Sequence, residues 1–275
     1  MGLRQAIAEP LLAVRAGTNA LPELQFLEIH PENYIARGGR FRALLERAQA
    51  HWPILTHGLT LGLGAVEPAD PGYVRELGRL LEKLAAPWHS EHLCFSSADG
   101  VMSHDLLPLP FTHDAVRVAV DRVRELRDAL ERPVAIENIS YYAHPGDAEM
   151  DEAEFLTEVL EQADAKLLLD VNNIYVNSRN HGFDALRFLE RLPLERVVQI
   201  HVAGHSQRPD GLLIDTHGTC VRDEVYVLLE HALARTGPRP VLLERDQSFP
   251  EIESLFAEVR RLHASYTRAT GVAWR

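Results

Sequence analysis

The chain has 275 residues, of which 46% are hydrophobic and 25% are charged. A chain of this size can bury one large core, and α/β barrels commonly reach it as one domain, here residues 1–275. The formal net charge of −12 argues against binding to a phosphate backbone, which usually requires a basic stripe. Nucleic acid is therefore excluded as the first choice of partner.

The sequence also bears on the compartment. No apolar run approaches the ~18–20 residues that span a bilayer, and residues 1–10 lack the charged and apolar regions of a signal peptide. We therefore expect a cytoplasmic protein with no membrane partner. Cys94 and Cys220 are too few for a disulfide framework, and each is expected to be a small buried side chain rather than a reactive thiol.

Short apolar runs alternate with segments of helical periodicity, which is typical of β/α units around a parallel sheet. Seven runs are expected to be strands, at 24–30, 53–58, 87–93, 132–138, 165–171, 196–202 and 239–245, and residues 1–4 could supply an eighth. Eight such units close into a (β/α)8 TIM barrel. An open doubly wound sheet would usually show a glycine-rich phosphate turn after its first strand, and the sequence has neither GxGxxG nor a Walker loop.

Helices are expected between the strands. In residues 114–130, valines and leucines recur every three or four positions on one helical face, and Asp114 or Thr112 is a candidate N-cap. Residues 151–163, 184–192, 222–236 and 250–264 show the same pattern. The glycine-rich stretch 58–64 lacks the lysine of a phosphate-binding loop and is expected to be a mobile loop over the barrel mouth.

Side chains of the types that bind metals stand near the C-terminal ends of the expected strands. They are Glu28, His30, His57, His92, Glu137, Asp170, Asn173, His201 and Glu244, and a loop adds Asp215 and His217. The strand ends of a TIM barrel converge on one rim, so these side chains are expected to be neighbours. Unpaired charges crowded there would each cost about several kcal/mol unless cations neutralised them. We therefore predict a metal site at the C-terminal rim.

The ligand types narrow the choice of metal. They include no cysteine, which argues against a structural thiolate zinc site, whereas a mixed nitrogen and oxygen set suits iron, manganese or catalytic zinc. Spacing alone does not choose the element. Glu137 or Glu244 could bridge two ions, because each carboxylate has two oxygens.

Neighbouring residues could orient the imidazoles or bind substrate. These are Glu28, His30, Glu32, Asn33, Glu91, Asn138 and Asn172, while Tyr34, Tyr141, Tyr142 and Tyr175 could line the pocket. The histidines away from strand ends, His51, His113, His144, His231 and His263, are expected at the surface. The sequence leaves the roles of His89, His104, His181 and His205 open.

Nine motifs in this order resemble one known family over essentially the whole chain. They are LEIHPENY (27–34), THGLTLGLG (56–64), SEHLCFS (90–96), HDLLPLP (104–110), IENISYY (136–142), LLLDVNNIYVNSRNHGFD (167–184), QIHVAGH (199–205), DTHG (215–218) and LLERD (242–246). The chain thus resembles the multinuclear non-haem iron-dependent oxidative enzymes. Such enzymes use two or three iron ions of mixed Fe(II)/Fe(III) valence, with O2, to oxidise cysteines of a ribosomally synthesised precursor peptide. They commonly work with a partner protein that recognises the peptide leader.

The resemblance also implies which residues would bind each ion. One iron would be held by His57, His92, Glu137 and Glu244; a second would lie near Asp170, His201 and Glu244, bridged by Glu137; and a third would be held by Asn173, Asp215 and His217. Two departures from the family pattern carry expectations of their own. Arg245 replaces a more usual aromatic and is expected to alter substrate access, and the short N-terminus is expected to weaken the barrel seam.

Three other functions fit parts of the pattern. A trizinc phosphodiesterase of the abasic-site endonuclease type would use metals to activate water, but the acidic charge and Asn173, where that barrel has histidine, count against it. A sugar isomerase or epimerase would need one Mn²⁺ or Mg²⁺ and an acid/base pair, which leaves His57, His92 and His217 surplus. A metal- or peptide-binding scaffold would retain metal without turnover.

Overall fold

The structure is a computed structural model that describes residues 1–16, 21–65, 67–98, 101–144 and 146–272. The side chain of His104, whose role the sequence left open, lies outside the described part of the chain. Seven parallel strands pair in the order β1-β2-β3-β6-β7-β8-β11. Their bounds are β1 Leu27–Ile29, β2 Ile54–Gly58, β3 His89–His92, β6 Val134–Glu137, β7 Lys166–Asp170, β8 Val197–Ala203 and β11 Val241–Glu244.

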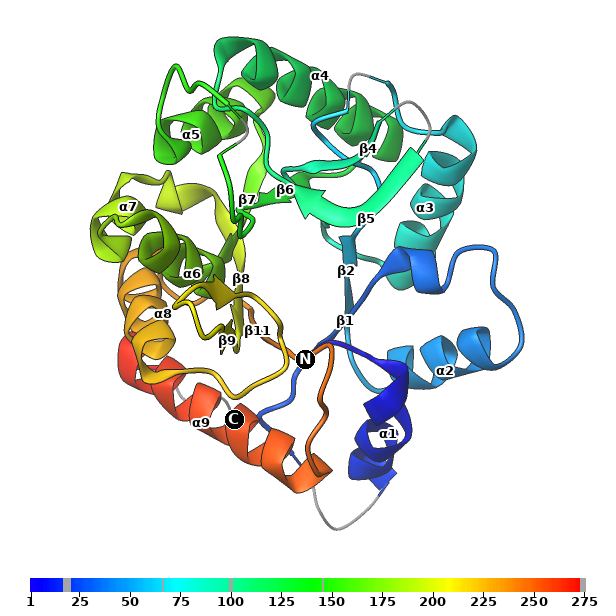
Figure 1. The fold of residues 1–275 in the computed structure, drawn as a ribbon. Coiled ribbons are helices and arrows are strands. Elements are labelled where there is room, and N and C mark those ends of the chain that lie inside the picture. The colour runs from blue at the N-terminus through cyan, green and yellow to red at the C-terminus, as the bar shows by residue number, and fades with distance from the viewer. Residues whose placement is uncertain (17–20, 66, 99–100, 145, 273–275) are drawn as a thin grey trace.

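Each of these strands overlaps a predicted run, and helices surround the sheet as an outer ring (Figure 1). The predicted TIM barrel is therefore confirmed. Most of the strands are rich in apolar residues because both of their faces are buried, but β3 consists entirely of buried polar residues and Gln199 lies within β8. His57, Glu137, Asp170 and Glu244 lie at or next to the C-terminal ends of their strands, and this edge carries the candidate site.

The predicted eighth strand at residues 1–4 is reduced to a single bridge. Gly2 pairs in parallel with Glu28 of β1, and the backbone N–H of Leu3 donates to the Glu28 carbonyl at 2.7 Å. Arg4 then reaches Glu244 at the end of β11. The N-terminal segment thus lies between β1 and β11 (Figure 1), where it covers the seam that the sequence analysis expected to be weak.

All five predicted helices are present. The helices are α1 Ala8–Ala16, α2 Arg40–Gln49, α3 Pro71–Leu84, α4 His113–Leu130, α5 Glu152–Ala163, α6 Val171–His181, α7 Ala185–Arg191, α8 Asp223–Thr236 and α9 Ile252–Thr270, with 3-10 turns at Gln5–Ile7, Pro31–Asn33 and Leu194–Arg196. Of the two candidate N-caps of α4, Thr112 is the one used, because its hydroxyl accepts the N–H of Ala115 at 3.2 Å. Asp151 and Glu154 cap α5 reciprocally.

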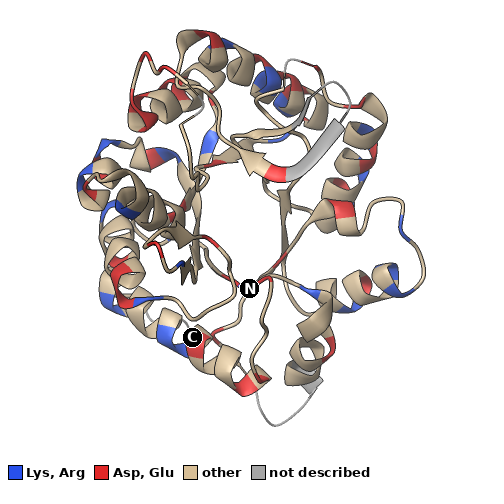
Figure 2. Cartoon of the chain, in the orientation of Figure 1, with Lys and Arg blue, Asp and Glu red and all other residues tan. Residues whose placement is uncertain are grey.

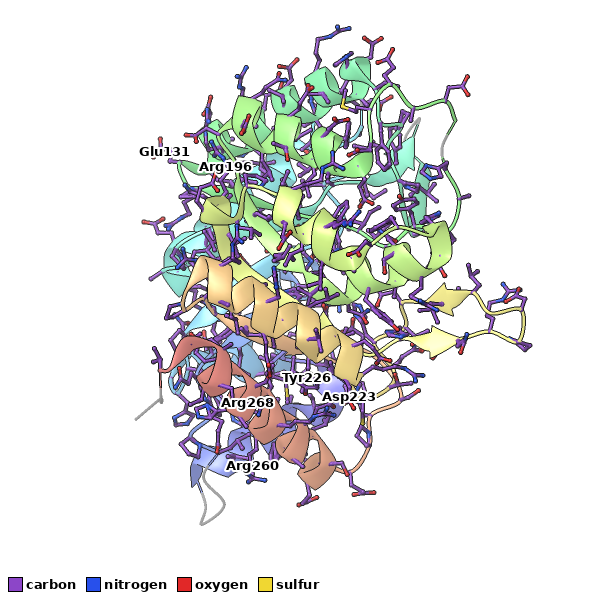
Figure 3. The ribbon with its side chains drawn as sticks, turned by 90° about the vertical axis from the view of Figure 1, so that its left-hand side faces the viewer. Glu131, Arg196, Asp223, Tyr226, Arg260 and Arg268 are labelled. Carbon is purple, nitrogen blue, oxygen red and sulfur yellow. The ribbon has the colours of Figure 1, made fainter. Side chains whose placement is uncertain are left out.

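Helix α6 was not predicted, and neither were α1, α2 and α3. Residues 171–178 of α6 are buried except Tyr175, so the helix shows no amphipathic stripe, and asparagines at four positions lower its intrinsic helix propensity. Two small antiparallel hairpins also went unpredicted: β4 (Phe95–Ala98) with β5 (Val101–Leu107), and β9 (Ser206–Gln207) with β10 (Leu213–Ile214). Both follow barrel strands and therefore rise from the C-terminal rim; Figure 3 shows β9–β10 projecting from the body.

The glycine-rich stretch 58–64 is packed, contrary to the expectation of a mobile loop. Leu63 is 2% exposed, the N–H of Gly64 donates to the Cys94 carbonyl at 3.0 Å, and the N–H of Leu59 donates to Glu32 Oε1 at 2.7 Å. A Cβ on Gly58 would lie 1.7 Å from Glu91 Oε1, so this position has no room for a side chain. Its glycines serve close packing rather than flexibility.

Charge is distributed differently inside and outside the barrel. Lys and Arg alternate with Asp and Glu over the outer helices (Figure 2), which is typical of a solvated surface. Glu28, Glu137 and Asp170, by contrast, are at most 2% exposed. Within the described residues, no helix is both long enough and apolar enough to cross a membrane.

Candidate metal centre

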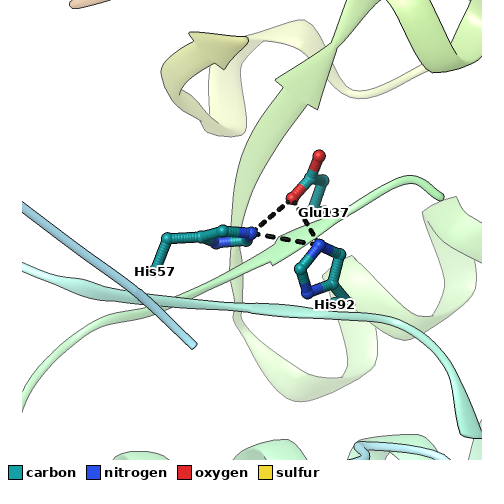
Figure 4. Close-up of side chains that lie close together, drawn as sticks. All are labelled: His57, His92 and Glu137. Carbon is teal, nitrogen blue, oxygen red and sulfur yellow. Dashed lines mark hydrogen bonds and ion pairs between the residues drawn. The ribbon is translucent and has the colours of Figure 1, made fainter. Parts of the chain in front are cut away.

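Three side chains from adjacent strands converge at the end of the barrel (Figure 4). His57 is the penultimate residue of β2, His92 ends β3 and Glu137 ends β6. His57 Nε2 lies 2.8 Å from Glu137 Oε2 and 3.1 Å from His92 Nε2, and His92 Nε2 lies 3.3 Å from the same Glu137 oxygen. Strand register accounts for this convergence, since His92 pairs with Glu137 and His57 pairs with Ser90 beside them.

The other nitrogen of each ring has a fixed partner. Ser90 Oγ donates to the Thr56 carbonyl at 3.0 Å and therefore accepts from His57 Nδ1, 2.9 Å away. His92 Nδ1 donates to the Gly58 carbonyl at 3.0 Å. With both Nδ1 atoms protonated, a ring in its neutral form turns its Nε2 lone pair toward the other ring and toward a carboxylate. Fixing the tautomer in this way is the usual role of the groups behind metal-binding histidines.

The electrostatics of this group favour a cation. Burial lowers the pKa of His57, but the carboxylates of Glu137 and Glu28 raise it further than burial lowers it. Burial and the neighbouring His57 lower the pKa of His92 to about 4. Glu137 Oε2 makes no hydrogen bond of good geometry with the described residues, despite its two short contacts. The buried carboxylates that raise the pKa of His57 would be neutralised by a metal ion as well as by a proton.

A second group spans the seam of the barrel, between the first strand of the sheet and its last two. His201 Nε2 lies 3.2 Å from Glu28 Oε2, and His201 Nδ1 lies 3.1 Å from Glu244 Oε2. Gln199 donates to the same Glu28 oxygen at 2.5 Å, while no donor among the described residues reaches Glu28 Oε1. Burial raises the pKa of Glu28, but the field of His201 outweighs it and brings the pKa down to about 2.

Glu137 connects the two groups. Its Oε1 lies 3.9 Å from His201 Nδ1, and Glu137, Asp170 and His201 each present a ligand atom within 4.8 Å of the others'. Asp170 Oδ1 caps α6 by accepting the N–H of Asn173 at 2.6 Å, which leaves Oδ2 without a partner among the described residues. Burial, Glu137 and Asp215 all raise the pKa of Asp170 well above its ordinary value. Glu137 is thus placed to bridge two ions.

A third group lies on loops. His217 Nε2 is 2.9 Å from Asp215 Oδ1, and Asn172 Nδ2 donates to that oxygen at 2.7 Å. Asn173, on the first turn of α6, points its Nδ2 toward Glu137 Oε1 at 3.5 Å, and its Oδ1 has no partner among the described residues. The burial and the mixed nitrogen and oxygen donors of these groups could hold iron, manganese or catalytic zinc.

The family is settled by comparison with known sequences. The model of the RiPP precursor modification enzyme family MbnB/TglH/ChrH matches residues 1–267. The chain belongs to this family. It is 43% identical over 270 residues to a UPF0276 protein of Alcanivorax borkumensis, covering 95% of this chain and 89% of that protein. It is 44% identical over 274 residues to a UPF0276 protein of Pseudomonas aeruginosa, covering 98% and 92%.

Solved structures that resemble this MbnB/TglH/ChrH family member include sugar epimerases. An L-ribulose 3-epimerase matches with a TM-score of 0.64 and 12% identity, covering 96% of this chain and 90% of the epimerase. A D-psicose 3-epimerase matches with a TM-score of 0.60 and 13% identity, covering 98% and 96%. At such low identity the likeness bears on the fold alone.

The geometry differs in detail from the ligand sets that the resemblance implied. Glu244 joins Glu28 and His201 rather than His57 and His92. Glu28 and His30, expected to orient ligands or bind substrate, each fall in a candidate metal group, His30 with Glu244 and Asp246. Asp246 was missed by the sequence analysis. The available signal was its position two residues after Glu244, the same spacing as Asp215 and His217.

The remaining neighbours mostly hold backbone or other side chains. Asn138 exchanges two hydrogen bonds with the backbone of Asp170, at 2.9 and 3.0 Å, and so joins β6 to β7. Glu32 accepts from Leu59 and Thr60, while the side chain of Asn33 has no contact that would assign it a role. Glu91 is buried and bonded to His89 Nε2 at 3.0 Å, behind the ligands rather than among them.

Three further expectations are corrected or refined. Arg245 is 3% exposed and pairs with Glu258 of α9 at 3.3 Å, so it faces the helix layer rather than a substrate path. Cys94 is buried as expected, but Cys220 is exposed. Tyr141 lines a pocket of about 540 Å³ that none of the candidate ligands lines, and its ring stacks on His181 there at 4.3 Å.

The other open residues find ordinary roles. His205 Nδ1 donates to Asn172 Oδ1, 2.8 Å away, and Tyr175 lies against its ring. Tyr34 belongs to the hydrophobic core, whereas the Tyr142 hydroxyl accepts the N–H of Asp215 at 3.0 Å. The histidines expected at the surface, His51, His113, His144, His231 and His263, are all exposed or half-buried.

Proposed function

We propose that this protein is a multinuclear iron-dependent oxidative enzyme that uses O2 to modify cysteine residues of a ribosomally synthesised precursor peptide. The observation that carries the proposal is the run of overlapping buried ligand groups, joined through Glu137, at the rim of a barrel whose family modifies RiPP precursors. Mixed Fe(II)/Fe(III) valence and the cysteine target are part of the proposal and rest on the resemblance described above.

The ligand atoms suggest where the ions would bind. His57, His92 and Glu137 would hold the first, and Glu137, Asp170, His201 and Glu244 the second, with Glu28 beside it. Asn173, Asp215 and His217 would hold a third. When bound, iron supplies reduction of O2 and lowers the pKa of a coordinated substrate thiol. Every other contribution comes from the chain itself.

The protein's own residues fix the donors before any ion arrives. Ser90 and the Gly58 carbonyl hold the two imidazoles with Nε2 facing inward, and the N–H of Asn173 holds one oxygen of Asp170. Because these contacts are made in the barrel wall, binding an ion requires little rearrangement.

Substrate and partner would approach from the rim. The β4–β5 and β9–β10 hairpins both rise there, and the exposed Tyr142 lies on the same side after β6. We propose that the precursor's cysteine-bearing segment enters between the hairpins and that a leader-recognising partner protein binds nearby. The reaction is proposed to take place in the cytoplasm, by a single catalytic domain spanning 1–275.

The test is oxidation of a cognate peptide. Protein loaded anaerobically with ferrous iron is mixed with O2, a short cysteine-containing precursor encoded beside it and the neighbouring companion protein. We expect O2 uptake and a mass change in the peptide that is lost when its cysteines are replaced by serine. No mass change at full iron loading, with the companion present, would reject the proposal.

The epimerase function is not favoured by the site. An epimerase of the kind described above needs one divalent ion between an acid/base carboxylate pair. Here His57 and His92 form a ligand group of their own, separate from Glu28, His201 and Glu244. If the Mn²⁺-loaded protein does not epimerise hexoses, that alternative is excluded.

A further inference from the structure

A chain of charged side chains runs from the N-terminal segment to the third ligand group. Arg4 Nε donates to Asp246 Oδ1 at 2.5 Å, and Asp246 Oδ2 lies 2.8 Å from His217 Nδ1. The opposite nitrogen of that imidazole, Nε2, faces Asp215 at 2.9 Å. Each oxygen of Asp246 therefore has one donor, and His217 is held on both sides.

Arg4 also touches the second ligand group. Its Nη2 lies 3.1 Å from Glu244 Oε1, while the other oxygen of Glu244 faces His201. The side chain of Arg4 is 11% exposed and that of Glu244 is 5% exposed. Burial lowers the pKa of Arg4, but Asp246 and Glu244 raise it further, so the guanidinium stays charged. This fixed cation occupies the outer oxygen of Glu244 and leaves the inner oxygen for a metal.

The loop that carries His217 is also hydrogen-bonded to residues 246 and 247. The N–H of Asp246 donates to the His217 carbonyl at 3.2 Å, and Gln247 Nε2 donates to the Thr216 carbonyl at 2.7 Å. His217 has a φ of 48°, a left-handed conformation that is uncommon for a residue with a side chain. Such a conformation persists only where surrounding contacts hold it.

From these contacts we infer that Asp246, fixed by Arg4, is a positioning residue that sets the affinity of the third metal position through His217. The inference rests on the proposed function, because it assumes that His217 Nε2 binds an ion. A carboxylate that accepts the Nδ1 proton fixes the tautomer and the ring orientation and makes Nε2 a better donor. Removing such a carboxylate typically weakens metal binding by about 10- to 100-fold.

The experiment measures metal content, not activity. Metal-free protein is titrated anaerobically with Fe(II), and bound iron per chain is measured by mass spectrometry after rapid desalting. We expect Asp246→Ala to weaken the last ion bound by about 10- to 100-fold while the first two bind as in the unmodified protein. Arg4→Gln should act in the same direction with a smaller change. Co(II) gives a second readout, because its visible d–d absorption reports the coordination number and geometry of the ions as each site fills.

Two further variants complete the test. Asp210→Ala is the matched control, since Asp210 pairs with Arg208 at 3.0 Å on the exposed β9–β10 hairpin and should leave all three affinities unchanged. Asp246→Asn keeps the side-chain volume and replaces Asp246→Ala if the latter does not fold. Equal weakening of all ions, no weakening, or only two ions bound by the unmodified protein would overturn the inference and leave the proposed function standing. Absence of any iron binding would instead reject the proposed function.

Discussion

The two sides of the candidate centre are built in different ways. His57, His92 and Glu137 stand at the ends of adjacent paired strands, and their side chains are 1%, 10% and 3% exposed. Asp215 and His217 stand on a loop, with side chains 11% and 17% exposed. Backbone pairing positions the strand-borne side, whereas side-chain contacts position the loop-borne side. The first should therefore bind its ions more tightly and tolerate less change.

The largest effect is expected at the residue that joins the ligand groups. Glu137→Gln removes the charge that lies within 2.8 Å of His57 and 3.9 Å of His201. We expect the affinity for each of two ions to fall by more than the ~100-fold that is typical when a residue behind a ligand is removed. Peptide oxidation should be lost as well. Iron titration and peptide mass measure this. If the variant bound both ions with unchanged affinity, Glu137 would not bridge them.

Removal of a loop-borne ligand should have a narrower effect. His217→Ala is expected to abolish binding of one ion and to leave two with unchanged affinity, because no ligand of the His57 group depends on that loop. The measurement is again iron bound per chain. Loss of all ions together would show that the two sides are one cooperative unit and would contradict the comparison.

A smaller effect is expected from the groups behind the ligands. Ser90→Ala removes the acceptor of His57 Nδ1 and should weaken the first ion by about 10- to 100-fold without altering the fold. Ser178→Ala is the matched control, since the Ser178 hydroxyl donates only to the carbonyl of Tyr175 in its own helix, at 2.7 Å. Equal affinities in the two variants would show that Ser90 does not orient the imidazole.

The smallest effect concerns a buried carboxyl outside the ligand groups. Burial raises the pKa of Glu152 to about 8, although hydrogen bonds from Tyr141 and Asn177 oppose the rise. The folded chain then holds this proton more tightly than the unfolded chain, so its contribution to stability is complete below about pH 4.5 and is lost as the pH rises to about 8.

Glu152→Gln should remove that dependence. The difference in melting temperature between the variant and the unmodified protein is expected to shift in favour of the variant by at least ~2–4 °C between pH 5 and pH 8. The metal ligands are the same in both proteins, so they cancel in this difference. If this difference in melting temperature stays constant across the pH range, Glu152 is not protonated in the folded protein.

The sequence identifies the strand-end side chains and the Asp215 and His217 pair, but not the contact between Arg4 and Asp246, for a physical reason. A polar residue at the end of an apolar run is visible in the pattern, and barrel closure brings all such ends together. Arg4 and Asp246 are 242 positions apart, and their contact depends on how the N-terminal segment meets the strand end. No hydrophobic periodicity and no sequence motif predicts such a contact.

The same distinction applies to the fold. Strands and amphipathic helices such as α4 follow from apolar periodicity, whereas α6 is buried on nearly all sides and carries no periodic signal. The hairpins at the rim and the packed 58–64 segment depend on tertiary contacts. The left-handed conformation of His217 likewise follows from the contacts of its loop with residues 246 and 247.

The central claim is that cations hold the carboxylates and imidazoles of the rim together. Anomalous diffraction from crystals of iron-reconstituted protein, collected on both sides of the iron absorption edge, tests it most directly. We predict iron peaks among His57, His92 and Glu137 and between Glu137, Asp170 and His201, with a weaker peak beside His217. A well-ordered map with these side chains in place and no iron peak among them would contradict the claim.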